Sequence, residues 1–270
     1  MPELPEVESV RQNVLPFLEK KVINVFYINK ETKLFEGKED FIKEKIEGQT
    51  VQKLNRIGKH LLIHLNNGFT LYIHLGVSGQ FYHGKDSSDK HAHFILENED
   101  KEKIIYRDPR RFGKIMVYET KAEKKFARLK NIGTDALLIN FEEFYKKIKE
   151  KNRAIKVALL DQAVLAGVGN IYADEALFST NILPTKKTKD IPKETYQQLL
   201  INIKQILNAS IAAKGSSVTY AVGGTGNKGN FQFSLNVYRR DKQKCNICSS
   251  PIQKMKLGGR GTHYCLCCQK

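Results

Sequence analysis

All five cysteines of this 270-residue chain lie between positions 245 and 268. Two Cys-x-x-Cys pairs, Cys245 with Cys248 and Cys265 with Cys268, are separated by sixteen residues. Each pair can present two thiolates from one tight turn, and four sulfurs complete the tetrahedron of a structural zinc site. A segment of about thirty residues can hardly build a core alone, so the metal would supply much of its folding free energy. Cys267 is spaced one residue too close to Cys265, and we therefore predict Cys268 as the fourth ligand of a single structural Zn2+.

The net charge of the chain constrains its partners. Lys and Arg exceed Asp and Glu by 16, and 11 of these excess charges fall in residues 131–270. A basic chain favours a polyanionic partner, most often nucleic acid, although a charge that serves only solubility is the alternative. No apolar run approaches the roughly 18 residues of a membrane helix, and the acidic N-terminus is unlike a secretory signal. We therefore expect an intracellular protein without membrane contact, and we find no sign of oligomerisation.

The spacing of apolar residues changes along the chain. Residues 3–20 have the pattern of an amphipathic helix, and residues 22–118 form short strand-like runs separated by turn residues. Beyond a charged linker at 121–134 the period becomes helical, with candidates at 141–150, 154–162, 171–179 and 193–213. The pattern predicts an α+β protein: an N-terminal antiparallel β-sandwich that opens with a helix, then a helical domain, then the cysteine-rich hairpin.

The N-terminal residues suggest a nucleophile. If Met1 is removed, Pro2 becomes a free secondary amine beside the carboxylate of Glu3. An α-amino group has a pKa of about 8, so roughly a tenth of it is unprotonated at neutral pH, whereas lysine is almost wholly protonated. Such an amine can attack an aldehyde-level carbon. The alternative is an ordinary helix start, with Pro5 in the first turn and acidic residues near the positive end of the helix dipole.

Two further motifs suit nucleic acid. In residues 165–170, two glycines turn the chain and Asn170 is predicted to cap the next helix, whose free N–H groups would donate hydrogen bonds to a phosphate. In residues 106–113, Arg110 and Phe112 lie in one turn, where Arg can fill the space of an extruded base and Phe can wedge between bases. A helix hairpin and a strand-end turn with Phe112 in the core are the alternatives. His91 and His93 alternate on a strand without an evident third ligand, which favours hydrogen bonding over metal binding.

Taken together, these motifs resemble the formamidopyrimidine-DNA glycosylase family. The resemblance runs along the whole chain. The occurrence of all of these motifs in the same order is far more specific than any single motif. The matching segments are PELPEVE at 2–8, the lysine at 59, HLGVSGQF at 74–81, RDPRRFGK at 107–114, LLDQAVLAGVGNIYADEALF at 159–178 and GGRGTHYC at 258–265. Leu4 favours the purine-directed branch, because the pyrimidine-directed relative endonuclease VIII typically has Gly there.

The resemblance implies a domain organisation and an activity. It implies a catalytic β-sandwich at 1–130, a helix–two-turn–helix domain at 131–238 with a lesion-covering loop at 217–233, and a zinc finger at 239–270. The implied enzyme is a bifunctional DNA glycosylase and abasic-site lyase. It would act on damaged double-stranded DNA in the bacterial cytoplasm, as a monomer, and would remove 8-oxoguanine and formamidopyrimidines.

The resemblance also assigns roles to individual residues. Pro2 would attack C1′ of the damaged nucleotide, Glu3 would be the general acid and base, and Glu6 would support the active site. Lys59 would hold phosphate near the lesion, and Arg260, which we also count with the catalytic residues, would grip a phosphate together with Asn170. The remaining expected DNA contacts are Val77, His91, Arg110, Phe112 and Lys156.

Three departures from the family pattern affect base selectivity more than the chemistry at Pro2. The family usually has Met at the position of Val77. Val is shorter and stiffer than Met, so it would probe the opened duplex less effectively. The loop usually carries Arg where residues 217–219 read Ser-Val-Thr, and Arg239 replaces a common Gly.

Overall fold

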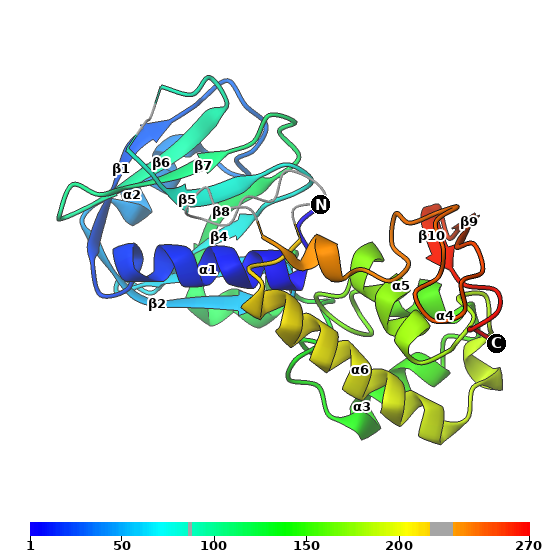
Figure 1. The fold of residues 1–270 in the computed structure, drawn as a ribbon. Coiled ribbons are helices and arrows are strands. Elements are labelled where there is room, and N and C mark those ends of the chain that lie inside the picture. The colour runs from blue at the N-terminus through cyan, green and yellow to red at the C-terminus, as the bar shows by residue number, and fades with distance from the viewer. Residues whose placement is uncertain (86–87, 217–228) are drawn as a thin grey trace. The chain divides into compact units, whose positions relative to one another are not determined.

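The computed structural model describes residues 1–85, 88–216 and 229–270 (Figure 1). The chain divides into two compact units: Met1–Lys130 with Ile211–Gln232, and Asn131–Ser210 with Phe233–Lys270. Residues 211–232 are predicted to lie in the helical domain, whereas the described residues among them, 211–216 and 229–232, group with the first unit. One long-range contact within this grouping is a hydrogen bond of 2.8 Å from the backbone N–H of Ser216 to a carboxylate oxygen of Glu6. Most of the expected lesion-covering loop, including residues 217–219, lies outside the described residues.

The first unit is built on one continuous antiparallel sheet with the strand order β5-β7-β6-β1-β2-β3-β4-β8. Its two halves join through a short β1–β2 ladder, in which only Val22 pairs with Thr50 and Ile23 with Gln49. Both halves contribute to a single apolar core, as expected for a sandwich. The strands are β1 (Val22–Ile28), β2 (Gln49–Ile57), β3 (His60–Leu65), β4 (Phe69–His74), β5 (Gln80–His83), β6 (Ala92–Asn98), β7 (Lys103–Arg107) and β8 (Lys114–Glu119).

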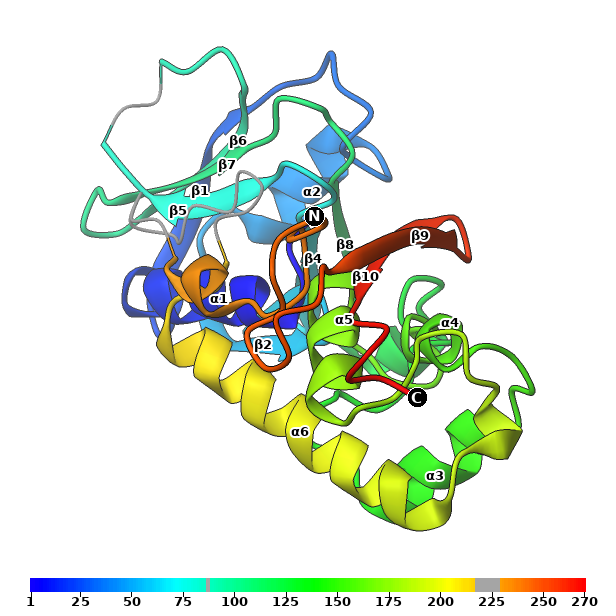
Figure 2. The same cartoon turned by 45° about the vertical axis from the view of Figure 1, so that its right-hand side comes forward.

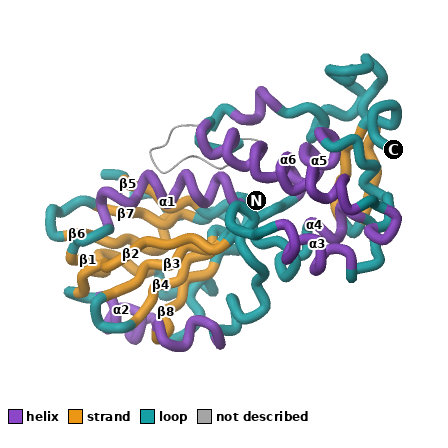
Figure 3. Tube along the Cα trace, turned by 90° about the horizontal axis from the view of Figure 1, so that it is seen from below, coloured by secondary structure: helices purple, strands orange, loops and turns teal. Residues whose placement is uncertain are grey.

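Two helices pack against this sheet. Helix α1 (Leu4–Leu18) buries a stripe at helical spacing, consisting of Val7, Val10, Val14 and Leu18. Figure 3 shows α1 along one side of the strands and α2 (Glu39–Ile46) along the other. A 3-10 helix, η1 (Thr120–Lys125), follows β8 in the segment that the sequence suggested as a linker. Because α1 is held by the core along its length, its N-terminal turn is a rigid support for functional groups.

The second unit is helical apart from one hairpin. Figure 2 shows this hairpin beside α5. Residues of α5 are in contact with the second strand of the hairpin. The predicted α+β fold class is confirmed. The elements are α3 (Phe141–Lys149), α4 (Ile155–Leu159), α5 (Asn170–Ser179), η2 (Thr188–Asp190), α6 (Lys193–Ala212), η3 (Phe231–Ser234), β9 (Gln253–Leu257) and β10 (Arg260–Tyr264). The last two residues of α6 and the first two residues of η3 belong to the first unit by contact.

One predicted helix is shorter than expected. The sequence extended it to residue 162, but α4 ends at Leu159 because the Asp161 carboxylate accepts the backbone N–H of Ala163 and starts a turn. Within the described ranges, no helix has both the length and the apolar character that a bilayer crossing requires.

Candidate functional site

The N-terminal turn of α1 holds its acidic side chains in defined positions. Pro2 and Glu3 are buried, while Met1 before them is 40% exposed. Glu3 is the N-cap of α1 and forms a capping box with Glu6. In this pair, a carboxylate oxygen of Glu6 accepts the backbone N–H of Glu3 at 2.9 Å. The backbone that carries Pro2 and Glu3 is therefore fixed by a hydrogen bond as well as by helix packing.

Glu6 has a second backbone partner. Its other carboxylate oxygen accepts the N–H of Ser216 at 2.8 Å, and Glu6 itself is only 4% exposed. Gly215 allows this close approach, since it has φ +82° and an added Cβ would come within 3.0 Å of the Glu6 side chain. One buried carboxylate thus links the start of α1 to the segment that follows α6.

Lys59 occupies a tight turn that is tied to the same helix. Gly58 and Lys59 are the two turn residues between β2 and β3, and Gly58 has φ +57°. The Arg56 guanidinium donates to the Gly58 carbonyl at 3.1 Å and to the Glu8 carboxylate at 2.9 Å. Glu8 belongs to α1, so this chain of bonds sets the position of Lys59 relative to the N-terminal turn.

Two histidines lie beside Lys59, and the sequence analysis did not single them out. His60 and His74 are directly opposite each other on β3 and β4, with ring centroids 5.0 Å apart. Burial is the main cause that lowers the pKa of His60 to about 3 and that of His74 to about 4. Repulsion from Lys59 and Arg128 lowers both pKa values further, and repulsion from His74 also lowers that of His60. Both rings are therefore neutral at physiological pH. The sequence carries one signal for this pairing, since Asn66, Asn67 and Gly68 are residues that favour a turn between two paired strands.

Asp108 organises the turn between β7 and β8. One of its carboxylate oxygens accepts from the Ser78 hydroxyl at 2.5 Å and from the Arg110 N–H at 3.2 Å. The other accepts the Gly113 N–H at 2.8 Å. Asp108 is fully buried, and it joins the segment that carries Val77 to the segment that carries Arg110 and Phe112.

The side chains supported by Asp108 are available at the surface. Phe112 is 54% exposed, which excludes the alternative that it packs in the core. The guanidinium of Arg110 lies over the Phe112 ring at 4.8 Å, in the geometry of a cation–π contact, and Val77 is partly buried. Gly76 must be glycine because a Cβ there would come within 2.5 Å of the Phe112 backbone. A cation and an aromatic ring are thus held together at one turn.

The His93 ring in β6 forms hydrogen bonds, as predicted, and His91 directly precedes this strand. His93 is buried, and its ring contacts the Asp108 carbonyl and the Asn29 side chain, each at 3.2 Å. His91 is partly buried, and its backbone N–H donates to Asp89 at 2.7 Å. Among the described residues, neither histidine belongs to a group that could hold a metal ion.

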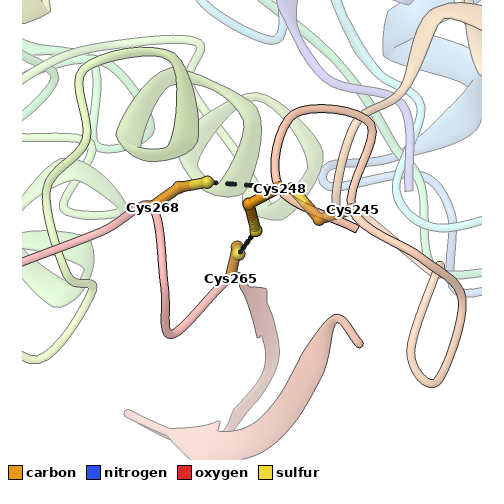
Figure 4. A group of neighbouring side chains, drawn as sticks. All are labelled: Cys245, Cys248, Cys265 and Cys268. Carbon is orange, nitrogen blue, oxygen red and sulfur yellow. Dashed lines mark hydrogen bonds between the residues drawn. The ribbon is translucent and has the colours of Figure 1, made fainter. Parts of the chain in front are cut away.

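The four predicted zinc ligands come together in the second unit. Figure 4 shows Cys245 and Cys248, from the loop before β9, turned toward Cys265 and Cys268 from the turn after β10. All four sulfurs lie within 4.8 Å of one another, and two of the distances are 3.4 and 3.9 Å. Zn–S bonds of about 2.3 Å in a tetrahedron place sulfurs about 3.8 Å apart, so the cluster fits one zinc ion. Cys267 is exposed and stands outside the cluster, as predicted.

Asn170 differs from its predicted role as a helix cap. Gly169 is the N-cap of α5, no side chain caps the helix, and Asn170 is its first residue. The Asn170 amide instead donates to the carbonyl of Gly261 in β10 at 2.9 Å. The sequence holds no local signal for this partner because the two residues are 91 positions apart. The contact places Asn170 beside exposed Arg260, so these two predicted phosphate ligands are neighbours.

Lys156, predicted as a DNA contact, is fully buried at 0% exposure. Its ammonium lies 2.6 Å from the Asp174 carboxylate and donates to the Thr262 hydroxyl and the Gly261 carbonyl at 2.7 and 3.1 Å. While these contacts are intact, the Lys156 ammonium presents no surface to a DNA phosphate.

Comparison with known proteins covers nearly the whole chain. Residues 1–115 match the formamidopyrimidine-DNA glycosylase N-terminal domain, residues 132–222 the H2TH domain of that enzyme, and residues 242–270 a zinc finger found in FPG and IleRS. The formamidopyrimidine-DNA glycosylase of Ureaplasma parvum is 38% identical over 281 residues that span both chains completely. The chain belongs to the formamidopyrimidine-DNA glycosylase family. This family consists of DNA glycosylases that also cleave at abasic sites.

Solved structures of another formamidopyrimidine-DNA glycosylase share the fold. Lactococcus lactis Fpg in complex with DNA containing an abasic site is 31% identical, with a TM-score of 0.88 and 99% of each chain covered. A mutant of the same enzyme in complex with Fapy-dG DNA is 32% identical, with a TM-score of 0.89 and full coverage of both chains. The formamidopyrimidine-DNA glycosylase fold therefore extends through both units of the present chain, including the zinc finger.

Proposed function

We propose that the protein removes oxidised purines from double-stranded DNA, using Pro2 as its nucleophile, and then cleaves the abasic strand. The observation that carries this proposal is the N-terminal turn of α1. A proline that would become the terminal residue stands directly before Glu3, and the backbone at Glu3 is fixed by the buried Glu6 carboxylate. Removal of Met1 exposes the amine and leaves this support unchanged.

The chemistry follows from a secondary amine. The Pro2 nitrogen forms a bond to C1′ of the damaged nucleotide as the C1′–N bond to the base breaks and the base leaves with that electron pair. Glu3 donates a proton to the sugar ring oxygen as the ring opens, and the nitrogen loses its own proton to give an iminium ion. The iminium acidifies the C2′ proton. Its removal expels the 3′ phosphate by β-elimination, and a second elimination expels the 5′ phosphate.

The proposed DNA contacts use cationic, amide and aromatic side chains of the two units. Arg110 and Phe112 suit the space that a flipped nucleotide leaves, because both are exposed at the surface and contact each other. Asn170 and Arg260 suit the phosphates on either side of that nucleotide. Lys59, tied to α1 through Arg56, suits a phosphate near the reacting sugar. We propose that a monomer makes all of these contacts.

Formamidopyrimidines and 8-oxoguanine are the proposed substrates. A related enzyme has been solved with Fapy-dG DNA, and Leu4, which is fully buried in the first turn of α1, matches the purine-directed branch. Excision of 8-oxoguanine and formamidopyrimidine from defined duplexes should exceed excision of thymine glycol. Faster release of thymine glycol would assign the protein to the pyrimidine-directed branch.

Borohydride trapping tests the nucleophile. The processed protein, incubated with abasic-site DNA and borohydride, should form a covalent complex whose sugar is attached to residue 2 by peptide mass spectrometry. Pro2→Gly should reduce trapping by about a hundredfold or more, as expected when an optimised covalent nucleophile is replaced. Pro5→Ala, which changes the same helical turn without altering the terminal amine, is the matched control.

Two results would contradict the proposal. One is full activity in protein that retains Met1, because the proline nitrogen is then an amide. The other is a cross-linked peptide in which a different side chain carries the sugar.

A further inference from the structure

A buried ion network joins the zinc hairpin to the helices beneath it. Lys156 and Asp174 are both completely buried, and their ammonium and carboxylate groups lie 2.6 Å apart. The second oxygen of Asp174 accepts the backbone N–H of His263 at 3.0 Å and lies 3.2 Å from its ring nitrogen. His263 belongs to β10, whereas Lys156 and Asp174 belong to α4 and α5. The network therefore connects three elements of the second unit.

The network reaches the expected phosphate ligands through one carbonyl group. The carbonyl oxygen of Gly261 accepts from the Lys156 ammonium at 3.1 Å and from the Asn170 amide at 2.9 Å. Arg260 directly precedes this residue and starts β10. Lys156 thus holds, through Gly261, the peptide segment that carries Arg260 and the side chain of Asn170.

The hairpin turn is supported from the same helix. Gly258 has φ +56°, and a Cβ built there would lie only 2.8 Å from Val157 in α4. The turn that precedes Arg260 therefore rests on the residue next to Lys156. Two independent contacts with α4, one polar and one apolar, therefore fix the position of the hairpin relative to the start of α5.

A buried ion pair is a poor device for stability alone. Removing two charges from water costs about as much as their attraction returns, and well-packed apolar residues often replace such a pair without loss. A pair of this kind does, however, impose one geometry on the groups it bonds. Here those groups are the Gly261 carbonyl and the backbone of His263.

We infer that Lys156 and Asp174 are positioning residues for the phosphate grip of Asn170 and Arg260, and that Lys156 acts without touching DNA. This inference rests on the proposed function, since it concerns the DNA contacts of the same site. It predicts that the effect of Lys156 on DNA binding is exerted through Arg260.

A double-mutant cycle tests the inference. Binding is measured over a range of KCl concentrations with a duplex that contains a tetrahydrofuran abasic analogue, which cannot be cleaved. Lys156→Met should weaken binding about tenfold and reduce the salt slope by about 0.9, the value for one lost phosphate contact. Arg260→Ala should reduce the slope by the same amount. The double variant should lose no further slope, because both changes remove the same contact.

Additive losses would overturn the inference. A slope lowered by about 1.8 in the double variant would mean that Lys156 binds a phosphate of its own. Unchanged affinity and slope in Lys156→Met would mean that the network serves only packing. If wild-type protein fails to bind the duplex, the proposed function itself is wrong; if it binds but the cycle is additive, only the present inference fails.

Two further variants control for folding and charge. Lys156→Met combined with Asp174→Asn removes both buried charges, so it should fold even if the single variant does not, and it should show the same reduced slope. Lys204→Met also removes one lysine of the second unit, whose ammonium donates to the Ile139 carbonyl at 2.7 Å. It should retain wild-type affinity and slope. A slope in Lys204→Met as low as in Lys156→Met would assign the effect to net charge and contradict the inference.

Discussion

The two ends of the chain hold their functional groups by different means. The N-terminal turn of α1 stands on a large apolar core to which α1, α2 and all eight strands of the sheet contribute. The zinc hairpin rests on a cluster of five buried residues, two of which are the metal ligands Cys245 and Cys265. The first end can rely on hydrophobic burial for rigidity, while the second needs metal and ionic contacts.

This difference also appears in the polar contacts. At the N-terminal end, Glu6 holds the backbone at Glu3 and Ser216, and it does so inside a framework that is already packed. At the hairpin, the Lys156–Asp174 pair connects α4 and α5 to the backbone of β10. The comparison teaches that loss of one polar group should alter local geometry at the first end and the docking of a whole module at the second.

Removal of zinc should have the largest effect on DNA binding, and the loss of structure should be confined to the zinc hairpin. Structural zinc contributes about 10 kcal/mol or more of binding free energy, which is coupled to folding of its ligands. Chelation, or Cys265→Ser, should abolish binding of abasic-analogue DNA. Hydrogen exchange should show loss of protection in residues 242–270 while the sheet of the first unit stays protected. Cys267→Ser is the matched control, and an equal loss of zinc in that variant would contradict the assignment of Cys268.

Glu6→Gln should have an intermediate effect at the other end. Glutamine has one acceptor oxygen where Glu6 accepts two buried backbone N–H groups, so one of them would lose its partner at a cost of about 1–3 kcal/mol. Thermal unfolding should record this loss, and borohydride trapping should slow because the backbone at Glu3 is released. The exposed Glu31→Gln is the control for charge. Normal trapping by a destabilised Glu6→Gln protein would show that Glu6 stabilises the fold but does not contribute to the reaction.

The smallest predicted effect is the pH dependence of Glu8. Burial acts to raise its pKa, but hydrogen bonds from Arg11 and Arg56 outweigh burial, and the pKa lies below its usual 4.5. The stabilisation is therefore complete above pH 4.5 and is lost as pH falls through the lowered pKa of the folded state. Wild type should exceed Glu8→Gln in unfolding free energy by about 1 kcal/mol at pH 7. The difference should shrink in acid; a constant difference would show that the carboxylate charge is unimportant.

Local patterns in the sequence were sufficient for much of this protein. The cysteine spacing identified the zinc ligands, and the helical period located α1, α3, α5 and α6 to within a few residues. These features depend on residues that are close in sequence, whose spacing directly sets their geometry. The predicted roles of Pro2 and Glu3 in the reaction remain predictions, and borohydride trapping is the measurement that decides them.

The tertiary structure decided the features that depend on distant residues. Asn170 does not cap its helix but donates a hydrogen bond to Gly261, and Lys156 is enclosed by Asp174 and β10. The described residues among 211–232 group with the first unit. The sequence alone does not distinguish a lysine that forms a buried ion pair from a lysine at the surface. Only the approach of chain segments about a hundred residues apart removes water from that ammonium and supplies its partners, and that desolvation is a property of the folded chain.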